Sequence, residues 1–208
     1  MVHWSNWACL SIFLTNYLAS IILNSIEMTS QVREDQTEDQ DSSRSKTTPE
    51  SRINSEPKNR LAEDAIIIRR FKPSDLEGAL ELDREVFGGY DPTIFTTFYE
   101  YHPRTTLVAE CRGTVVGFVL GFKHTPLEGR VFWLAVRPGY QCRGVGRKLL
   151  TSILRTFRFM GSVSATLEVR ISNKKAQALY SGMGFEMITI YPGYYSDGEP
   201  AIIMKRRL

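Results

Sequence analysis

The sequence predicts an α/β fold in residues 65–208, built on one mixed β-sheet with helices on its faces. Three observations predict it. Short β-branched and aromatic runs that suit strands alternate with amphipathic segments of helical spacing. Glycine and proline residues separate these segments. The 208 residues are 42% hydrophobic, enough for one cored domain with an appendage, which excludes a wholly disordered chain.

The predicted elements follow in the order β-α-α-β-β-β-α-β-α-β-β. The first strand is the β-branched run 65–70, and the first helix begins at residues 73–75 and stops at the glycines 88–89. A short helix spans 91–101, and Arg112-Gly113 joins two strands in a hairpin. The later elements are a strand at 130–136, a helix at 144–160, a strand at 165–169, a helix at 173–183, and strands at 185–190 and 201–205.

Charge divides the chain into three regions. Residues 1–27 are apolar and contain one charged side chain, Glu27. Residues 28–64 hold 6 basic and 9 acidic residues and almost nothing to bury, which predicts a disordered acidic linker. Residues 65–208 hold 20 basic and 13 acidic residues, so the predicted domain is basic and suits an anionic ligand.

The apolar segment 1–27 has three interpretations. It reaches the roughly 20 residues of a membrane anchor, although Asn16 and Asn24 interrupt it and no Lys or Arg precedes it. The second interpretation is a cleaved signal peptide, but no cleavage site is clear. The third interpretation is that translation begins at Met28. We expect a cytoplasmic protein, attached to a membrane only if residues 1–27 are a real anchor. Three cysteines without CxxC spacing agree with a reducing compartment.

A glycine pair precedes the helix predicted at 144–160. Glycines let backbone approach a ligand closely, and free N–H groups at a helix start favour an anion such as a pyrophosphate. The loop is not a Walker motif, because Val145 replaces the lysine, nor a dinucleotide fingerprint, because Leu149 replaces the third glycine. Taken alone, the pair also fits an ordinary helix-entry turn. The loop consists of Gln141, Cys142, Arg143, Gly144, Val145 and Gly146, and Arg147 and Lys148 follow it.

This loop and four later segments resemble the GCN5-related N-acetyltransferases (GNAT), whose signature is Gln/Arg-x-x-Gly-x-Gly/Ala. The segments LEVR-x-SN, ALY-x-x-x-GF, YY-x-x-G and DGEPAIIM are similar to the branch that acetylates protein N-termini, in particular RimI-like ribosomal-protein alanine acetyltransferases. The resemblance covers residues 65–208 and is strongest from 130 onward. It implies the GNAT fold, acetyl-CoA as cosubstrate, no metal, and a protein or peptide N-terminus as acceptor, with a ribosomal protein as one candidate.

The resemblance also implies where the coenzyme binds. Its pyrophosphate is expected at residues 141–146. Leu134, Ala135 and Val136 match the family's splayed strand, whose backbone groups receive the pantetheine arm and the acetyl carbonyl. Asn173 fits a helix N-cap on its own sequence context. By resemblance it adds a hydrogen bond to the coenzyme.

Two ionisable residues match the base and the acid of RimI-like enzymes. Attack on a thioester needs a neutral amine and then a proton for the departing thiolate, tasks that suit a carboxylate and a phenol. Glu168 stands in LEVR-x-SN and Tyr180 in the ALY segment, with the same twelve-residue separation as in that branch. Without the resemblance, Glu168 would be interpreted as a strand residue that faces solvent, and Tyr180 as a half-buried packing residue of a helix.

Three tyrosines are the candidate acceptor-binding residues. Tyr194 and Tyr195 follow Pro192-Gly193. There the resemblance implies a pair that holds the first peptide units of the substrate, although an aromatic loop can also cover a core edge. Tyr90 belongs to the segment 88–95, which would form the opposite wall. This segment departs from the Pro-Trp pair of RimI-like enzymes, which leaves the preferred first residue open.

Other features support no separate activity. Cys142 suggests a covalent acetyl-cysteine step, but no His is near it in the sequence and the family transfers directly. The three histidines lack metal-ligand spacing. The basic residues 205–207 suit a solvated end, and no nucleic-acid partner is expected. The sequence therefore predicts an N-acetyltransferase of protein α-amines. A lysine or small-molecule amine acetyltransferase and a noncatalytic acyl-CoA-binding module are the alternatives.

Overall fold

The computed structural model describes residues 65–89 and 91–208. The predictions for segments 1–27 and 28–64 and for Tyr90 concern residues outside this described part. Within it the predicted order of elements is confirmed. The elements are β1 (Ile67–Arg70), η1 (Pro73–Asp75), α3 (Leu76–Phe87), α4 (Thr93–Tyr101), β2 (Thr106–Cys111), β3 (Thr114–Thr125), β4 (Glu128–Val136), η2 (Pro138–Tyr140), α5 (Val145–Phe159), β5 (Ser164–Arg170), α6 (Lys174–Ser181), β6 (Glu186–Tyr191) and β7 (Ala201–Arg207).

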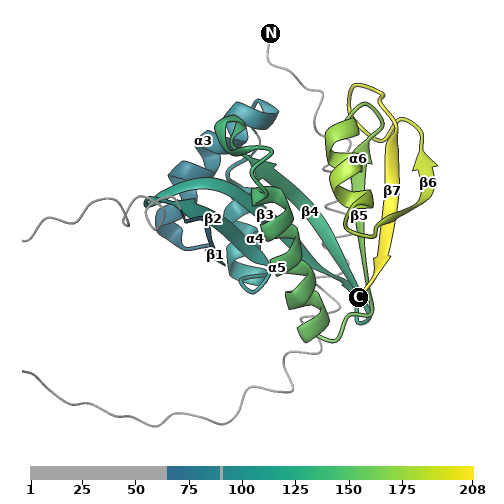
Figure 1. The fold of residues 1–208 in the computed structure, drawn as a ribbon, viewed down its shortest axis with the longest axis horizontal. Coiled ribbons are helices and arrows are strands. Elements are labelled where there is room, and N and C mark those ends of the chain that lie inside the picture. Colours follow the sequence, from purple (N-terminus) through teal and green to yellow (C-terminus); the bar gives the residue numbers. More distant parts are fainter. Residues whose placement is uncertain (1–64, 90) are drawn as a thin grey trace, which may run out of the picture.

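Seven strands form one mixed sheet in the order β1-β2-β3-β4-β5-β7-β6. Neighbouring strands are antiparallel except β4 and β5, which are parallel and are connected through α5. In Figure 1, α5 lies over β3 and β4, and the C-terminal group of β5, α6, β6 and β7 lies on the right. Among the described residues, no helix combines the length and hydropathy that a bilayer crossing requires.

Two hydrophobic clusters cover opposite faces of the N-terminal half of the sheet. On one face α5 buries Leu149, Ile153 and Phe157 completely. Glycine at position 129 makes room for the Phe157 ring, since a Cβ there would lie 2.4 Å from a ring carbon. On the other face α3 and α4 pack against β2 to β4, around residues such as Phe95. This half therefore has a helix layer on each side.

The C-terminal half has a helix layer on one face only. Leu167 and Val169 of β5 belong to the cluster that contains residues of α5 and α6. The alternating residues of the same strand, Thr166, Glu168 and Arg170, point to the other face. The cluster around α3 and α4 contains no residue of β5, β6 or β7. We call the side of β5 that carries Thr166, Glu168 and Arg170 the open face.

The parallel ladder between β4 and β5 is short. It runs from the pair Glu128–Ser164 to the pair Val131–Leu167. Beyond it β4 pairs only with β3, and β5 pairs only with β7. A register shift against β3 leaves Phe132 as an extra residue, and such a bulge bends a strand. The two strands diverge from this point (Figure 1), and Glu168 is the first residue of β5 after the last pair.

The basic end of the chain refines one prediction. Residues 205–207 were expected to form a solvated end; Lys205 and Arg207 are exposed, but the last strand, predicted at 201–205, continues to Arg207 and pairs with β5 as far as Arg207–Ser164. The Lys205 ammonium binds the Glu128 carboxylate, and Arg206 donates a hydrogen bond of 2.6 Å to the carbonyl of Met183. Long-range pairing with β5, which no local pattern encodes, extends this strand.

Candidate active site

Glu168 lies on the open face, where β4 and β5 part. Arg130 of β4 binds it through two nitrogens, with Nη2 2.9 Å from Oε1 and Nε 3.1 Å from Oε2. The Glu168 side chain is only 12% exposed. Burial raises the pKa of Glu168, and the Arg130 guanidinium opposes this rise. A mostly buried carboxylate whose pKa is raised toward neutrality suits proton transfer.

The same arginine also contacts the loop between β6 and β7. Arg130 Nη2 donates to the Tyr194 hydroxyl at 3.3 Å. The rings of Tyr194 and Tyr195 meet edge to face with centroids 5.1 Å apart, and Tyr191 packs against Tyr194 at 6.0 Å. The structure therefore brings the predicted base together with the two described tyrosines of the predicted acceptor site.

Arg170 fixes this loop to the end of β5. Its guanidinium lies 3.9 Å from the Tyr195 ring centroid and forms ion pairs with Asp197 at 2.8 Å and Glu199 at 2.6 Å. Glu199 also accepts a hydrogen bond from the Ser172 amide. The hydrogen bonds from Ser172 and then Arg170 lower the pKa of Glu199 to about 2, so this carboxylate stays charged at neutral pH.

Tyr180 lies on α6 in the hydrophobic core, with 7% of its surface exposed and its ring 6.1 Å from that of Phe185. Burial raises the pKa of Tyr180 to about 12, so the phenol remains a proton donor at neutral pH. Burial also raises the pKa of Tyr195, and smaller contributions come from Glu168 and Tyr180. In the described part no hydrogen bond joins Tyr180 to Glu168.

The glycine loop presents free backbone donors at the start of α5. Gly144 is the N-cap with φ +81°, a left-handed conformation that favours glycine, and the exposed Cys142 also has a positive φ of 59°. No side chain caps this helix. Within the described residues the amides of 142–147 have no hydrogen-bond acceptor. An uncapped helix start with basic neighbours is a fitting site for an anion.

Three elements meet closely at Gly146. A Cβ there would lie 3.3 Å from Leu179 of α6, 3.7 Å from Val136 and 3.9 Å from Leu134. Gln141 donates from Nε2 to the Val136 carbonyl at 3.0 Å, which ties the loop to the end of β4. Ala135 is 2% exposed and belongs to the cluster on the opposite face. The predicted phosphate-binding loop therefore adjoins the predicted pantetheine strand.

The remaining loop and cap residues have partners of their own. The Arg143 guanidinium lies 5.6 Å from the Tyr140 ring centroid, and Arg147 donates to the Gly182 carbonyl at 3.2 Å. Asn173 caps α6, because its Oδ1 accepts from the Ala176 amide at 3.0 Å. The predicted N-cap is confirmed. A ligand contact of Asn173 would then come from its side-chain nitrogen.

Sequence reasoning missed three charged residues of this site, Arg130, Arg170 and Glu199. Arg170 and Glu199 stand inside the motifs LEVR-x-SN and DGEPAIIM, so a signal for them was present. Arg130 had none. It reaches Glu168 only because the register of β4 against β5 sets it opposite Thr166, two residues before the glutamate.

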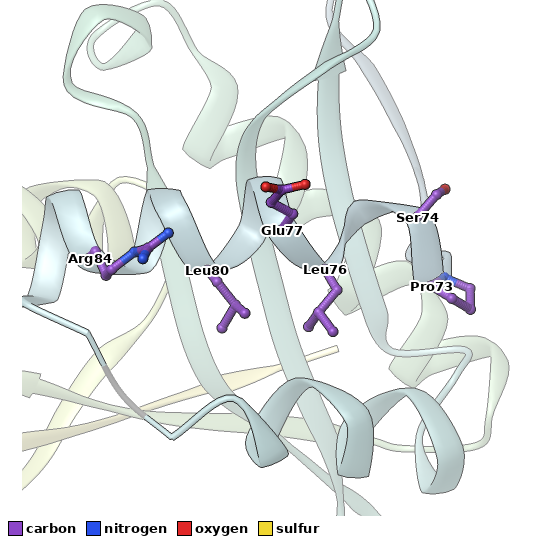
Figure 2. Close-up of a pocket in the computed structure, with 6 residues that line it drawn as sticks. All are labelled: Pro73, Ser74, Leu76, Glu77, Leu80 and Arg84. Carbon is purple, nitrogen blue, oxygen red and sulfur yellow. The ribbon is translucent and has the colours of Figure 1, made fainter.

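A shallow groove of about 390 Å³ lies along η1 and α3. Figure 2 shows Leu76 and Leu80 pointing to the same side of the helix. The residues that line the groove are Pro73, Ser74, Leu76, Glu77, Leu80 and Arg84, and none of them is a predicted site residue. Among the residues described, no group of three or more His, Cys, Asp or Glu side chains is placed to hold a metal ion.

Comparison with known proteins defines the class. The model of the acetyltransferase (GNAT) family matches residues 76–185. An uncharacterized N-acetyltransferase of Methanocaldococcus jannaschii is 36% identical over 148 residues, which cover 68% of this chain and 92% of that protein. The chain belongs to the GNAT acetyltransferase family and is an N-acetyltransferase, which confirms the class expected from the glycine loop.

Two further comparisons indicate the branch. The N-alpha-acetyltransferase RimI of Mycobacterium tuberculosis is 34% identical over 151 residues, covering 69% of this chain and 93% of that enzyme. The crystal structure of the ribosomal-protein-S18-alanine N-acetyltransferase from Escherichia coli aligns with a TM-score of 0.62 at 30% identity, over 69% of this chain and 94% of that one. The RimI-like resemblance is confirmed.

Proposed function

We propose that this enzyme transfers the acetyl group of acetyl-CoA to the N-terminal α-amine of a protein or peptide, with Glu168 as base and Tyr180 as acid. One observation carries the proposal. The buried carboxylate of Glu168, held by Arg130, lies where β4 and β5 part and next to the loop of Tyr194 and Tyr195. A base beside an aromatic loop on an uncovered sheet face is accessible to the end of a peptide.

The residues present fit a coenzyme A thioester. The amides of 142–147 have no acceptor among the described residues, and glycines at 144 and 146 keep side chains away from the helix start. The β5-facing edge of β4 has no strand partner beyond Val131. In this proposal the phosphates bind at 141–146, and the edge formed by Leu134, Ala135 and Val136 holds the pantetheine with help from Asn173. When bound, acetyl-CoA supplies the acetyl group as a thioester.

The proposed proton transfers use the two pKa values that burial shifts. Glu168 accepts a proton from the attacking amine, directly or through one water, while the nitrogen–carbon bond forms and the carbon–sulfur bond breaks. The Tyr180 hydroxyl donates a proton to the departing sulfur. An α-amine has a pKa of about 8, against about 10.4 for a lysine, so one carboxylate suffices to deprotonate it near neutral pH.

The relatives support an α-amine as acceptor. The Mycobacterium tuberculosis relative is named an N-alpha-acetyltransferase, and the Escherichia coli structure is of an enzyme that acts on the alanine of a ribosomal protein. By analogy we propose a ribosomal protein N-terminus, and hence a reaction in the cytoplasm, as the first acceptor to test. Transfer to a lysine or to a small-molecule amine is the competing proposal.

Two matched peptides test the acceptor. One has a free N-terminus and no lysine; the other has the same sequence with a blocked N-terminus and one added lysine. With the full-length protein and acetyl-CoA, we expect mass spectrometry to show acetylation mainly of the free N-terminus. Preferred acetylation of the blocked peptide would overturn the α-amine proposal in favour of a lysine. Coenzyme binding without product from either peptide would instead favour a small-molecule acceptor.

A further inference from the structure

Arg130 connects the two parts of the proposed site. One guanidinium binds both oxygens of Glu168 and also donates to the Tyr194 hydroxyl. Arg130 comes from β4, Glu168 from β5 and Tyr194 from the loop between β6 and β7. Its side chain is 22% exposed, so solvent screens these contacts only in part.

The surroundings of Glu168 leave Arg130 as its charge partner. From β4, Glu128 adds a negative charge that raises the pKa of Glu168 slightly. Lys205 of β7, which lies opposite Thr166, binds Glu128 instead. The residue of β7 opposite Glu168 is the apolar Ile203, and the loop contributes the phenols of Tyr194 and Tyr195. The cation of Arg170 is committed to Asp197, Glu199 and the Tyr195 ring.

We propose that Arg130 is a positioning residue, which keeps the Glu168 carboxylate ionised and oriented for proton transfer and couples it to the acceptor loop through Tyr194. This inference rests on the proposed function of Glu168 as base. Two nitrogens on two oxygens fix the plane of the carboxylate, which a single contact would not do. The hydrogen bond from Arg130 to the Tyr194 hydroxyl makes the position of that carboxylate sensitive to any movement of Tyr194.

The test compares three variants by their pH profiles. Arg130→Gln keeps hydrogen-bonding capacity but removes the charge, so the acid limb of kcat/KM for the acceptor peptide should move to higher pH by about one unit. On the acid limb the rate should fall about tenfold, and it should recover at higher pH. Arg130→Lys should restore part of the shift. Tyr194→Phe, which removes the hydroxyl that accepts from Arg130, should raise the peptide KM several-fold and leave the acid limb in place.

Arg206→Gln is the matched control. Arg206 is a partly buried arginine of β7 that donates to a backbone carbonyl instead of a carboxylate. Its loss should leave the acid limb unchanged. A structural role of Arg130 alone would lower thermal stability without moving that limb. Arg130→Gln in a Glu168→Gln background should cost almost no further activity, because both changes disable one unit.

A measurement without turnover separates this inference from the proposed function. Carbon-13 NMR of glutamate-labelled full-length protein follows the Glu168 carboxyl, assigned with Glu168→Gln. Its pKa should be higher in Arg130→Gln than in the wild type. An unchanged titration, or activity losses that simply add in the double variant, would overturn the inference. Full turnover by Glu168→Gln would overturn the base assignment itself, and with it the catalytic importance of Arg130.

Discussion

Strands β2 to β4 have helices on both faces, whereas β5 and β7 have helices on one face only and neither hydrophobic cluster contains a residue of β6. In the covered half five of the six residues of β2 are buried; in the other half all six residues of β6 are exposed. The covered half needs interlocking apolar side chains on both sides. The open half can place charged and aromatic groups where a substrate reaches them. The parted strands β4 and β5 mark the boundary between these two environments.

Two arginine–carboxylate pairs illustrate the difference. In the covered half Arg69 binds Asp75 and Glu110 at 2.6 Å each and joins β1 to η1 and β2. Burial would raise the pKa of Asp75, but hydrogen bonds from Arg69 and from the Lys72 amide outweigh burial and lower it. At Glu168 burial outweighs Arg130 and the pKa is raised. The first carboxylate therefore holds its charge and its place, whereas the second is suited to exchange a proton.

The largest effect is expected from Glu168→Gln. The amide keeps the shape of the side chain but cannot accept the amine proton, so turnover at pH 7 should fall about 10²–10⁴-fold. Part of the rate should return at high pH, where the amine deprotonates without help. Acetyl-CoA affinity should be unchanged, because in the proposed mechanism this carboxylate acts on the acceptor amine. Steady-state kinetics across pH, with calorimetry for acetyl-CoA, measure both.

Asp75→Asn is the control from the covered half. It weakens a buried, multiply bonded carboxylate, so it should lower the unfolding temperature and leave turnover of the folded protein intact. Wild-type turnover by Glu168→Gln at pH 7 would exclude Glu168 as base. A loss of turnover by Asp75→Asn in the folded state would contradict the division between the halves.

Gly146→Asp should have the next largest effect, at the boundary between the halves. The variant sets a negative charge at the uncapped helix start, and its Cβ would press on Leu179 at 3.3 Å. Acetyl-CoA should bind at least about 100-fold more weakly, because repulsion replaces charge-assisted hydrogen bonds to its phosphates. Isothermal calorimetry on the folded variant gives the affinity.

Two glycine variants separate charge from shape. Gly146→Ala adds only the Cβ and should weaken binding modestly. Gly139→Asp adds the same charge in η2, where a Cβ meets nothing within 4 Å. This position lies outside the run of free amides at 142–147. It should weaken binding far less than Gly146→Asp. Unchanged affinity in a folded Gly146→Asp would remove the loop from the coenzyme site.

Local sequence patterns predicted the element order and the helix starts, because caps, glycines and periodicity act over a few residues. The helix predicted to reach residue 183 ends at Ser181, since the amides of Met183 and Gly184 bond to the carbonyls of Tyr180 and Ser181, three residues back, in a closing turn. The strand predicted at 201–205 extends to Arg207, because β5 pairs with it over its full length. Pairing between distant strands, which periodicity does not report, set the second of these boundaries.

The sequence also predicted part of the candidate site. Motif residues Glu168, Tyr194 and Tyr195 were found and do come together. Their assigned roles remain predictions. Arg130 was missed because it acts across the sheet, and its position beside Glu168 follows from the bulge at Phe132 and the register of β4. Physical contacts across strands thus supplied what the motif could not, namely the charged partner of the candidate base.

The smallest effect is expected from His102 in the covered half, and it concerns stability alone. Its ring packs 5.6 Å from Phe98 and 5.7 Å from Phe122, and burial lowers its pKa to about 4. In the unfolded chain a histidine has a pKa of about 6.5. Below that pH His102 binds a proton in the unfolded state, whereas in the folded state it stays mostly neutral until the pH approaches 4. The free energy of unfolding should therefore fall by about 2 kcal/mol between pH 7 and pH 5 from this residue.

Urea unfolding at pH 7, 6 and 5 measures this slope, and His102→Phe should flatten it, because the variant keeps an aromatic ring and removes the titrating group. Glu168 contributes with the opposite sign, since its raised pKa makes the folded state the stronger proton binder as the pH falls. That contribution is common to both proteins and cancels in their difference. His124→Gln, at an exposed histidine, should keep the wild-type slope. Equal slopes for His102→Phe and the wild type would show that His102 is not the buried neutral group. A flattened slope with unchanged acetylation at pH 7 would show that the covered half affects stability without affecting the reaction.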